Sequence, residues 1–170
     1  MAVELVAQFE GCAKRGGDGL IYPYLDRLAK PPVWTRGYGR TYGITADSPP
    51  ITKDEAMAEL REGLENYGRQ CLDLAPPLAE RPASLAAVTS WAWNCGVGAF
   101  KASRLRRAIN AENWNDAARF ILTPRTAGGV ELPGLARRRD AEAALFASDA
   151  EEDAPAETSA AANTAPPSQG

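Results

Sequence analysis

The chain has 170 residues, of which 45% are hydrophobic and 24% are charged, with a net charge of -3 and no histidine. This is the composition of an ordinary globular domain, and no apolar run approaches the roughly 20 residues that cross a bilayer. The absence of histidine excludes Ser-His and Cys-His catalysis and nearly every zinc hydrolase site. Carboxylates are the catalytic groups that remain, and neither a metal nor a cofactor is expected.

The charges are unevenly distributed along the chain. Residues 148–170 carry five acidic side chains and no basic one, so residues 1–147 hold 19 basic against 17 acidic side chains. This mildly cationic part suits an anionic polymer, although so small a charge does not by itself exclude nucleic acid. Residues 148–170 are rich in Ala, Ser, Glu, Pro and Thr and contain no aromatic residue. We therefore expect one domain over 1–147 and a disordered acidic tail over 148–170.

The cysteines and the first residues bear on the cellular compartment. Cys12, Cys71 and Cys95 are odd in number and lack CxxC spacing, which favours reduced, buried thiols over a disulfide framework. The first six residues lack both a basic start and a long apolar stretch, so no secretory signal is visible. The sequence thus indicates synthesis in the cytoplasm without a signal peptide.

The first predicted element is a short amphipathic helix that ends at Glu10. Apolar residues recur at helical spacing as far as Phe9, and Gly11 follows where a C-terminal cap belongs. A carboxyl group at a helix C-terminus faces the negative end of the macrodipole, which disfavours its ionised form. A general acid needs this bias, so Glu10 is a candidate for that role.

Residues 16–44 are rich in glycine, proline, aromatic and β-branched residues, which predicts a small, irregular antiparallel sheet. Within this segment, Asp26 and Thr35 bring a second carboxylate and a hydroxyl toward Glu10. A protonated acid paired with a carboxylate left ionised is the minimum equipment for cleaving a glycosidic bond.

The rest of the chain predicts a mostly helical body. A capping box at Thr52–Glu55 and apolar steps of three and four residues predict a long helix over 53–74, which two prolines stop. Further helices are expected around residues 85–92, 104–110, 114–121 and 135–146, with a loop through 126–134. The predicted fold is α+β, with a larger helical lobe and a small antiparallel β lobe at one side.

These strings in order resemble the phage-type lysozymes, the endolysin family known as glycoside hydrolase family 24. The N-terminal strings are Phe9-Glu10-Gly11, Tyr24-Leu25-Asp26 and WTRGYGRT at 34–41, similar to the family's FEG, AYxD and WTIGYGHT. The C-terminal strings are WNCGVGAF at 93–100 and LPGLARRRDAE at 132–142. The resemblance extends from about Val3 to Phe146 and implies a lysozyme-like fold.

The resemblance implies hydrolysis of the β-1,4 bond between N-acetylmuramic acid and N-acetylglucosamine in peptidoglycan. By position, Glu10 is the general acid, Asp26 stabilises oxocarbenium charge or helps to activate water, and Thr35 positions that water. The implied partners are glycan strands, with no nucleic acid and no membrane insertion. The protein is expected to be a monomer that a holin-type partner releases to the wall. Beside this site, Tyr24 and Trp34 are candidates for stacking on sugar rings.

Two departures from the family pattern concern the site. The family spaces its residues as E-x8-D-x5-T, whereas fifteen residues separate Glu10 from Asp26 and eight separate Asp26 from Thr35. Asp18 lies nearer the usual distance and stays open as the second carboxylate, although the Tyr-x-Asp context favours Asp26. Arg40 replaces the family's histidine, and we interpret it as a structural residue in a permanent ion pair with a carboxylate.

Several other residues have structural interpretations. The three tryptophans in helical patterns are expected in the core: Trp91, Trp93 and Trp114. Asn94 is expected to cap or bridge backbone near the site, and at least one of Arg137–Arg139 is expected to pair with an internal acid such as Asp140 or Glu142.

Two other functions remain open. A lytic transglycosylase needs one acid/base glutamate and no carboxylate to activate water. A domain derived from a lysozyme could instead bind the wall without cutting it.

Overall fold

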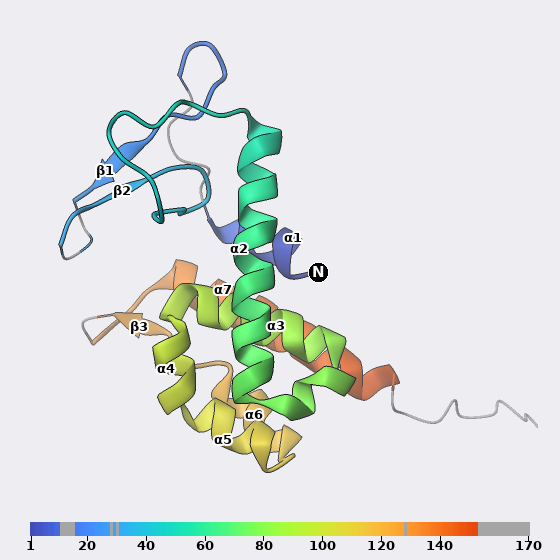
Figure 1. Cartoon of the computed structure of the whole chain (residues 1–170). Coiled ribbons are helices and arrows are strands. Elements are labelled where there is room, and N and C mark those ends of the chain that lie inside the picture. The colour runs from blue at the N-terminus through green and yellow to red at the C-terminus, as the bar shows by residue number, and fades with distance from the viewer. Residues whose placement is uncertain (11–15, 28, 30, 128, 153–170) are drawn as a thin grey trace, which may run out of the picture.

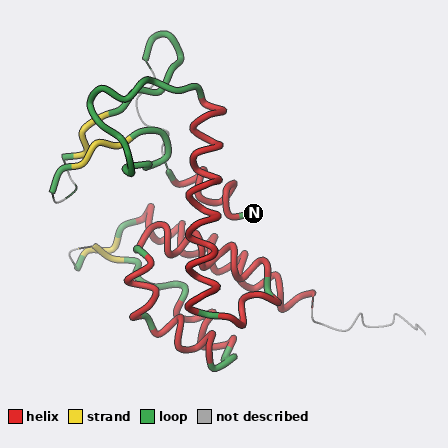
Figure 2. The backbone as a smooth tube through the Cα atoms, viewed as in Figure 1, coloured by secondary structure: helices red, strands yellow, loops and turns green. Residues whose placement is uncertain are grey.

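The computed structural model describes residues 1–10, 16–27, 29, 31–127 and 129–152 (Figures 1 and 2). A long helix, α2 (Lys53–Leu74), has a small lobe of loops and strands at one end and a cluster of helices at the other (Figure 1). The short helix α1 (Ala2–Phe9) lies beside the middle of α2. This is the predicted α+β arrangement of two unequal lobes. Within the described residues, no helix combines the length and the apolar character needed to cross a membrane.

The sheet of the small lobe has two strands, β1 (Tyr24–Asp26) and β2 (Val33–Thr35), paired antiparallel with Tyr24 opposite Thr35. Side chains alternate across a strand, so Tyr24, Asp26 and Thr35 share one face. Leu25 and Trp34 are paired on the other face. The predicted sheet is therefore confirmed, but it is short, and Figure 2 shows that loops form most of this lobe.

Helix α2 has the predicted bounds and joins the two lobes. The Glu55 amide donates to Thr52 Oγ1 at 3.2 Å, and the Thr52 amide donates to Glu55 Oε2 at 2.7 Å, which completes the predicted capping box. Leu60 and Leu64 pack in the small-lobe core, whereas Cys71 packs in the core of the helical lobe. One helix thus contributes to both cores and links the two lobes.

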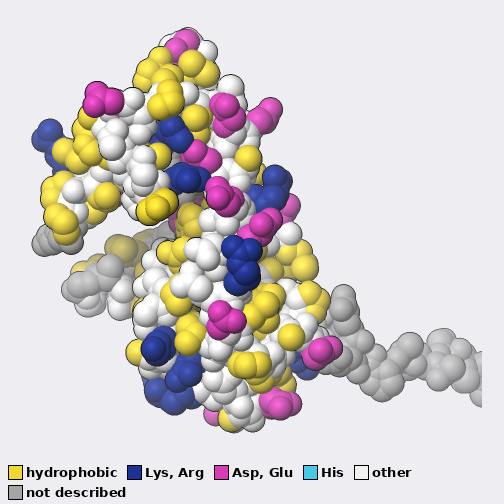
Figure 3. Space-filling model, viewed as in Figure 1, with side chains coloured by type: hydrophobic (Ala, Val, Ile, Leu, Met, Phe, Trp, Pro, Cys, Tyr) yellow, Lys and Arg dark blue, Asp and Glu magenta, His cyan; other side chains and the backbone are white. Residues whose placement is uncertain are grey.

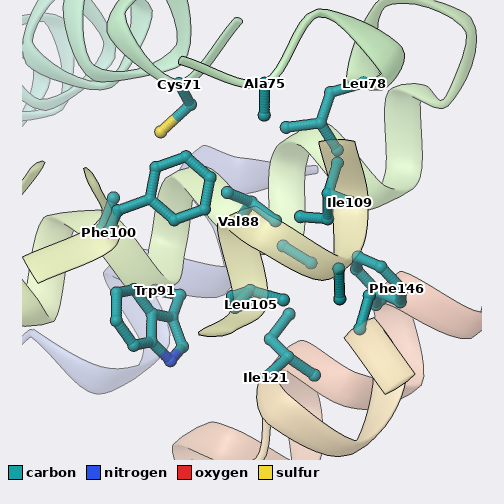
Figure 4. Packing of buried hydrophobic residues seen from close by; sticks show 14 residues of the cluster. Cys71, Ala75, Leu78, Val88, Trp91, Phe100, Leu105, Ile109, Ile121 and Phe146 are labelled. Carbon is teal, nitrogen blue, oxygen red and sulfur yellow. The ribbon is translucent and has the colours of Figure 1, made fainter. Parts of the chain in front are cut away.

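The helical lobe is arranged around α3 (Pro82–Cys95), which is buried continuously from Ala86 to Ala92 and packs against both α2 and α7. Figure 4 shows the core beside it, where Val88 and Trp91 meet Phe100. The remaining elements of this lobe are η1 (Pro76–Glu80), α4 (Val97–Ala102), α5 (Arg104–Asn110), α6 (Trp114–Phe120), β3 (Thr126–Ala127), β4 (Val130–Glu131) and α7 (Pro133–Glu152).

The predicted helices are confirmed, but α3 and α7 extend beyond the residues predicted for them, and two short elements were not predicted. The helix over 104–110 has the expected bounds, and α6 ends one residue before the predicted end at Ile121. Helix α4 was not predicted, because six residues are too few for a periodic apolar pattern. The predicted loop through 126–134 contains the β3–β4 hairpin, whose two-residue strands are likewise too short to show alternation.

The predicted boundary after residue 147 is too early, because α7 continues to Glu152. Asp149 is 5% exposed, and its carboxylate accepts from the backbone amides of Ala83 at 3.1 Å and Ser84 at 2.6 Å. These amides belong to the first turn of α3, whose own N-cap residue Arg81 makes no side-chain cap. An aspartate that composition assigns to the tail therefore caps the central helix. Residues 153–170 of the predicted tail lie outside the described residues.

The cysteine prediction can be assessed at two positions. Cys71 and Cys95 are free thiols, and Cys12 lies outside the described residues. Cys71 is fully buried, and this burial raises the pKa of its thiol to about 12. Its neutral, apolar side chain therefore acts as part of the core.

Replacing Asp149 tests the cap on α3. We expect Asp149→Ala to lower the free energy of unfolding by about 2 kcal/mol, because two buried amides lose their acceptor. The matched control is Asp140→Ala on the same helix, whose exposed pair with Arg125 contributes at most about 1 kcal/mol. Urea unfolding followed by circular dichroism measures both, and an equal loss in the two variants would contradict the capping role.

Candidate active site

A pocket of about 650 Å³ opens between the small lobe and the helical lobe. Its wall contains Glu10 at the end of α1, the turn of residues 39–42 and one face of α2. The last turn of α3 completes it with Trp93 and Asn94. Segments far apart in the sequence thus meet around one candidate catalytic carboxylate.

Glu10 is held at the C-cap of α1, where its backbone amide donates to Val6 O at 2.9 Å. Its side chain is 29% exposed, and Oε1 accepts a hydrogen bond from Arg138 Nη1 at 2.7 Å. The helix end brings the negative end of its dipole to this carboxyl group, whereas the guanidinium places a positive charge beside it. Two opposed electrostatic influences therefore act on Glu10, and the sequence predicted only the first.

Arg138 is itself fixed by a buried network. Glu142 is fully buried, and its Oε1 accepts from Arg138 Nε at 3.1 Å and from Ser90 Oγ at 2.7 Å. Glu142 Oε2 accepts from Arg139, and Arg138 also donates to the Ser90 carbonyl at 3.2 Å. With Glu10 ionised, two guanidinium groups balance two carboxylates, and protonation of Glu10 leaves one excess positive charge.

The expectation of an internal ion pair among the three consecutive arginines is confirmed for two of them, Arg138 and Arg139, which both pair with Glu142. The contact between Arg138 and Glu10 was missed by sequence reasoning. No local spacing could indicate it, because the two residues lie near opposite ends of the described chain. Only the packing of α7 against α1 and α3 joins them.

Asp26 and Thr35 lie on the same face of the sheet, but neither lines the pocket. Asp26 Oδ1 accepts from the Ala29 amide at 3.4 Å, so this carboxylate also organises the turn after β1. Thr35 is 4% exposed, and its Oγ1 donates to Val33 O at 3.4 Å. Of the three predicted catalytic residues, only Glu10 contributes to the pocket wall.

The pKa of Tyr24 is affected by the charges of both candidate carboxylates. Burial raises the pKa of its hydroxyl, and the negative charges of Asp26 and then Glu10 raise it further. Tyr24 therefore stands within the electrostatic field of both groups and keeps its proton at neutral pH.

Asp18, the alternative second carboxylate, lies in an exposed turn. Its Oδ1 accepts from the Leu20 amide at 3.0 Å and its Oδ2 accepts from the Tyr22 hydroxyl at 2.7 Å. These hydrogen bonds, the one from Tyr22 first, lower the pKa of Asp18. Both oxygens thus serve their own turn, and Asp18 does not line the pocket.

The aromatic wall of the pocket differs from the prediction. Tyr67 and Trp93 pack with ring centroids 5.0 Å apart, and both line the pocket together with Tyr42. Trp93 reaches this place because Gly63 faces it, where an added Cβ would lie 2.9 Å from the indole ring. The expected core position of Trp93 is confirmed by its packing against the small-lobe core, and the same side chain also lines the pocket.

The two aromatic residues proposed for sugar stacking, Tyr24 and Trp34, are absent from the pocket lining. They also lie on opposite faces of the sheet.

The other tryptophan predictions are confirmed in part. Trp91 is buried in the core and donates from Nε1 to Thr123 O at 2.7 Å, whereas Trp114 is half-buried against Phe146.

Two ion pairs tie the turn at the pocket mouth to α2. Arg40 pairs with Glu62 at 3.0 Å, which confirms the expected ion pair at the position of the family's histidine. Arg36, where the family pattern has isoleucine, pairs with Glu59 and donates to Pro49 O at 2.7 Å. Both pairs fix the small lobe against the long helix.

Asn94 bridges side chains rather than backbone. Its Oδ1 accepts from Arg139 Nη2, so it joins the pocket wall to the buried network under Glu10.

Comparison with known proteins was consistent in sequence and in fold. The sequence model of the family described as phage lysozyme matches residues 7–142 of this chain. The endolysin of Bacillus phage B103 is 29% identical over 126 residues, which make up 74% of this chain but 48% of that protein. This chain therefore spans about half the length of that relative. The endolysin of Acyrthosiphon pisum secondary endosymbiont phage 1 is 32% identical over 120 residues, or 68% of this chain and 80% of that protein.

The same fold is found in a solved structure, the active form of the P1 phage endolysin Lyz. It superposes with a TM-score of 0.70 at 23% identity, over 88% of this chain and 85% of that one. The chain has two lobes joined by α2 and a glutamate at the end of its first helix. Because the match to the family covers most of its residues, the chain belongs to the phage lysozyme family.

Proposed function

We propose that this protein is a muramidase that hydrolyses the β-1,4 bond between N-acetylmuramic acid and N-acetylglucosamine in peptidoglycan. Membership of the phage lysozyme family supports a peptidoglycan hydrolase. The observation that carries the proposal is the position of Glu10, in the wall of an interlobe pocket and hydrogen-bonded to a buried arginine. Aromatic rings and polar groups in the same wall suit a glycan strand.

The proposed acid step uses the opposed influences on Glu10. Protonated Glu10 donates its proton to the glycosidic oxygen as the bond to the sugar breaks. The carboxylate that forms is then stabilised by Arg138, which Glu142 and Ser90 already hold in place. Because this ion pair is stronger after the proton has left, it favours the transition state over the resting acid.

The second carboxylate is proposed to be Asp26. It stabilises positive charge on the sugar ring or helps to activate water, with Thr35 positioning that water. Asp26 shares a face of the sheet with Thr35, and the negative charges of Asp26 and Glu10 both contribute to the raised pKa of Tyr24. In the pocket wall, Tyr67 and Trp93 are the proposed surfaces for the sugar rings.

One observation favours a second candidate function. Asp26 and Thr35 are absent from the pocket lining, which leaves Glu10 as the only one of the three proposed catalytic residues there. A lytic transglycosylase needs one acid/base glutamate, because the sugar's own hydroxyl replaces water as the nucleophile. The product then carries a 1,6-anhydro ring, which distinguishes this reaction from hydrolysis.

Replacing Glu10 tests the proposed acid. We expect Glu10→Gln to reduce the release of reducing sugar from purified peptidoglycan by at least about 100-fold, because an amide cannot donate the required proton. The control is Glu4→Gln, an exposed glutamate on the same helix whose ion pair is with the N-terminus. Full activity in Glu10→Gln would contradict the assignment.

Replacing Asp26 separates the two candidate reactions. For a hydrolase we expect Asp26→Asn to lose most activity, with the remaining product ending in a reducing sugar. Full activity with 1,6-anhydro product, detected by mass spectrometry, would establish the transglycosylase instead. Asp18→Asn serves as the control and is expected to keep wild-type activity, because its carboxylate serves only its own turn.

The role of Arg138 is testable through the rate of the reaction. In Arg138→Met the carboxylate formed in the reaction loses its cationic partner, so we expect kcat to fall by about 100-fold while KM changes little. Arg138→Lys retains the charge and should recover part of this loss. Steady-state kinetics and thermal melting are measured for both variants. A lower melting temperature with an unchanged kcat would assign Arg138 a structural role only.

A further inference from the structure

A second feature of the surface lies away from the pocket, on α4 and α5. Between Glu80 and Glu112 the sequence contains no acidic residue and five basic ones, and four of these fall within Val97–Asn110. The chain as a whole has a net charge of -3. Figure 3 shows dark blue side chains gathered at the lower left, where these two helices lie in Figure 1.

Three of these residues, Lys101, Arg104 and Arg107, are exposed, and we call them the basic face. Arg107 Nη1 donates to Ala102 O at 3.1 Å, which places its guanidinium at the end of α4, the helix that carries Lys101. The guanidinium carbon of Arg104 lies 4.8 Å from the centroid of the Phe120 ring. Local contacts thus orient both arginines on the surface of the helical lobe.

None of the three basic side chains forms an ion pair with a residue that the structure describes. This contrasts with the arginines at the site, where Arg36, Arg40, Arg138 and Arg139 all pair with glutamates. The positive charges of the basic face are therefore not neutralised by described carboxylates and are available to an anionic ligand. The basic face therefore has the character of a binding surface for anions.

The apolar residues of these helices indicate which anion fits. Phe100, Leu105 and Ile109 are buried in the core. Large apolar side chains that are exposed in the described residues all lie elsewhere: Met1, Tyr22, Leu25, Tyr42, Val130 and Leu132. Binding in a membrane interface requires an exposed apolar face beside the charges. Charge without that face favours a hydrated polyanion over a lipid surface.

The basic face is also close to the pocket along the chain. Asn94 lines the pocket at the end of α3, and α4 begins three residues later. Lys101 follows Asn94 by seven residues, which limits their separation to about 25 Å. A polymer bound here would therefore come from the same region of the wall as the glycan strand in the pocket.

We propose that Lys101, Arg104 and Arg107 bind a phosphodiester polymer carried by the bacterial wall, and so hold the enzyme on its substrate. This rests on the proposed function, because it takes the wall as the target. A polymer with repeating phosphates can contact several separate cations at once, and guanidinium groups bind phosphate through paired N–H donors. Binding of this kind is electrostatic and weakens as salt is raised.

The test compares two variants of the whole chain in a Glu10→Gln background, which prevents wall degradation during the measurement. One variant carries Lys101→Gln, Arg104→Gln and Arg107→Gln. The control removes the same charge from other exposed positions through Lys53→Gln, Arg61→Gln and Arg119→Gln. Binding is measured by co-sedimentation with purified walls that retain their phosphate polymers, with walls stripped of them by cold hydrofluoric acid, and with anionic phospholipid vesicles.

We expect roughly tenfold weaker binding of the basic-face variant to phosphate-bearing walls at low salt, with a shallower salt dependence than wild type. On stripped walls the two variants should bind equally. The proposal is overturned if the control loses as much affinity, if stripping the walls leaves wild-type binding unchanged, or if only vesicles bind through these residues. Hydrolysis of stripped walls by the chain with Glu10 intact is measured separately, so failure of the proposed enzyme function is distinguished from failure of this surface.

Discussion

The site depends on the buried pairing of Arg138 with Glu142. Removing a charged group from water costs several kcal/mol, so a fully buried glutamate persists only where cations and donors surround it. Glu142 meets this requirement with two arginines and the hydroxyl of Ser90. The same contacts hold Arg138 in the position from which it donates a hydrogen bond to Glu10. One network of ion pairs and hydrogen bonds therefore joins α7, α3 and α1 and also positions the candidate catalytic glutamate.

This arrangement makes the environment of Glu10 a property of the whole fold. The negative end of the α1 dipole and the positive charge of Arg138 both lie beside the carboxyl group of Glu10. An acid that loses its proton in the reaction benefits from a cation already positioned beside the carboxylate that forms. The interpretation of Glu10 from its helix end alone was therefore incomplete, because it left out the arginine.

The pocket depends equally on α2. This helix packs in both cores, and its glutamates pair with arginines of the small lobe. Two arginines in the turn before α2 pair with its glutamates, so the small lobe is fixed along the face that forms the pocket. Gly63 on the same helix allows the indole of Trp93 to lie against α2 and line the pocket.

The sequence by itself determined the elements whose causes are local. Apolar periodicity, a capping box and stopping prolines located α2 to the residue, and ordered motifs indicated the family, the two-lobed fold and Glu10. Short elements such as α4 were missed because their pattern is too brief to be periodic.

Only the tertiary structure decided which distant groups meet. The partner of Glu10, the cap that Asp149 places on α3 and the position of Trp93 in the pocket all join segments that no spacing relates. Asp26 illustrates the opposite case. Its sequence motif indicated a catalytic residue, but in the fold Asp26 does not line the pocket. Local sequence sets helices and turns through nearby contacts, but long-range contacts depend on how complete elements pack.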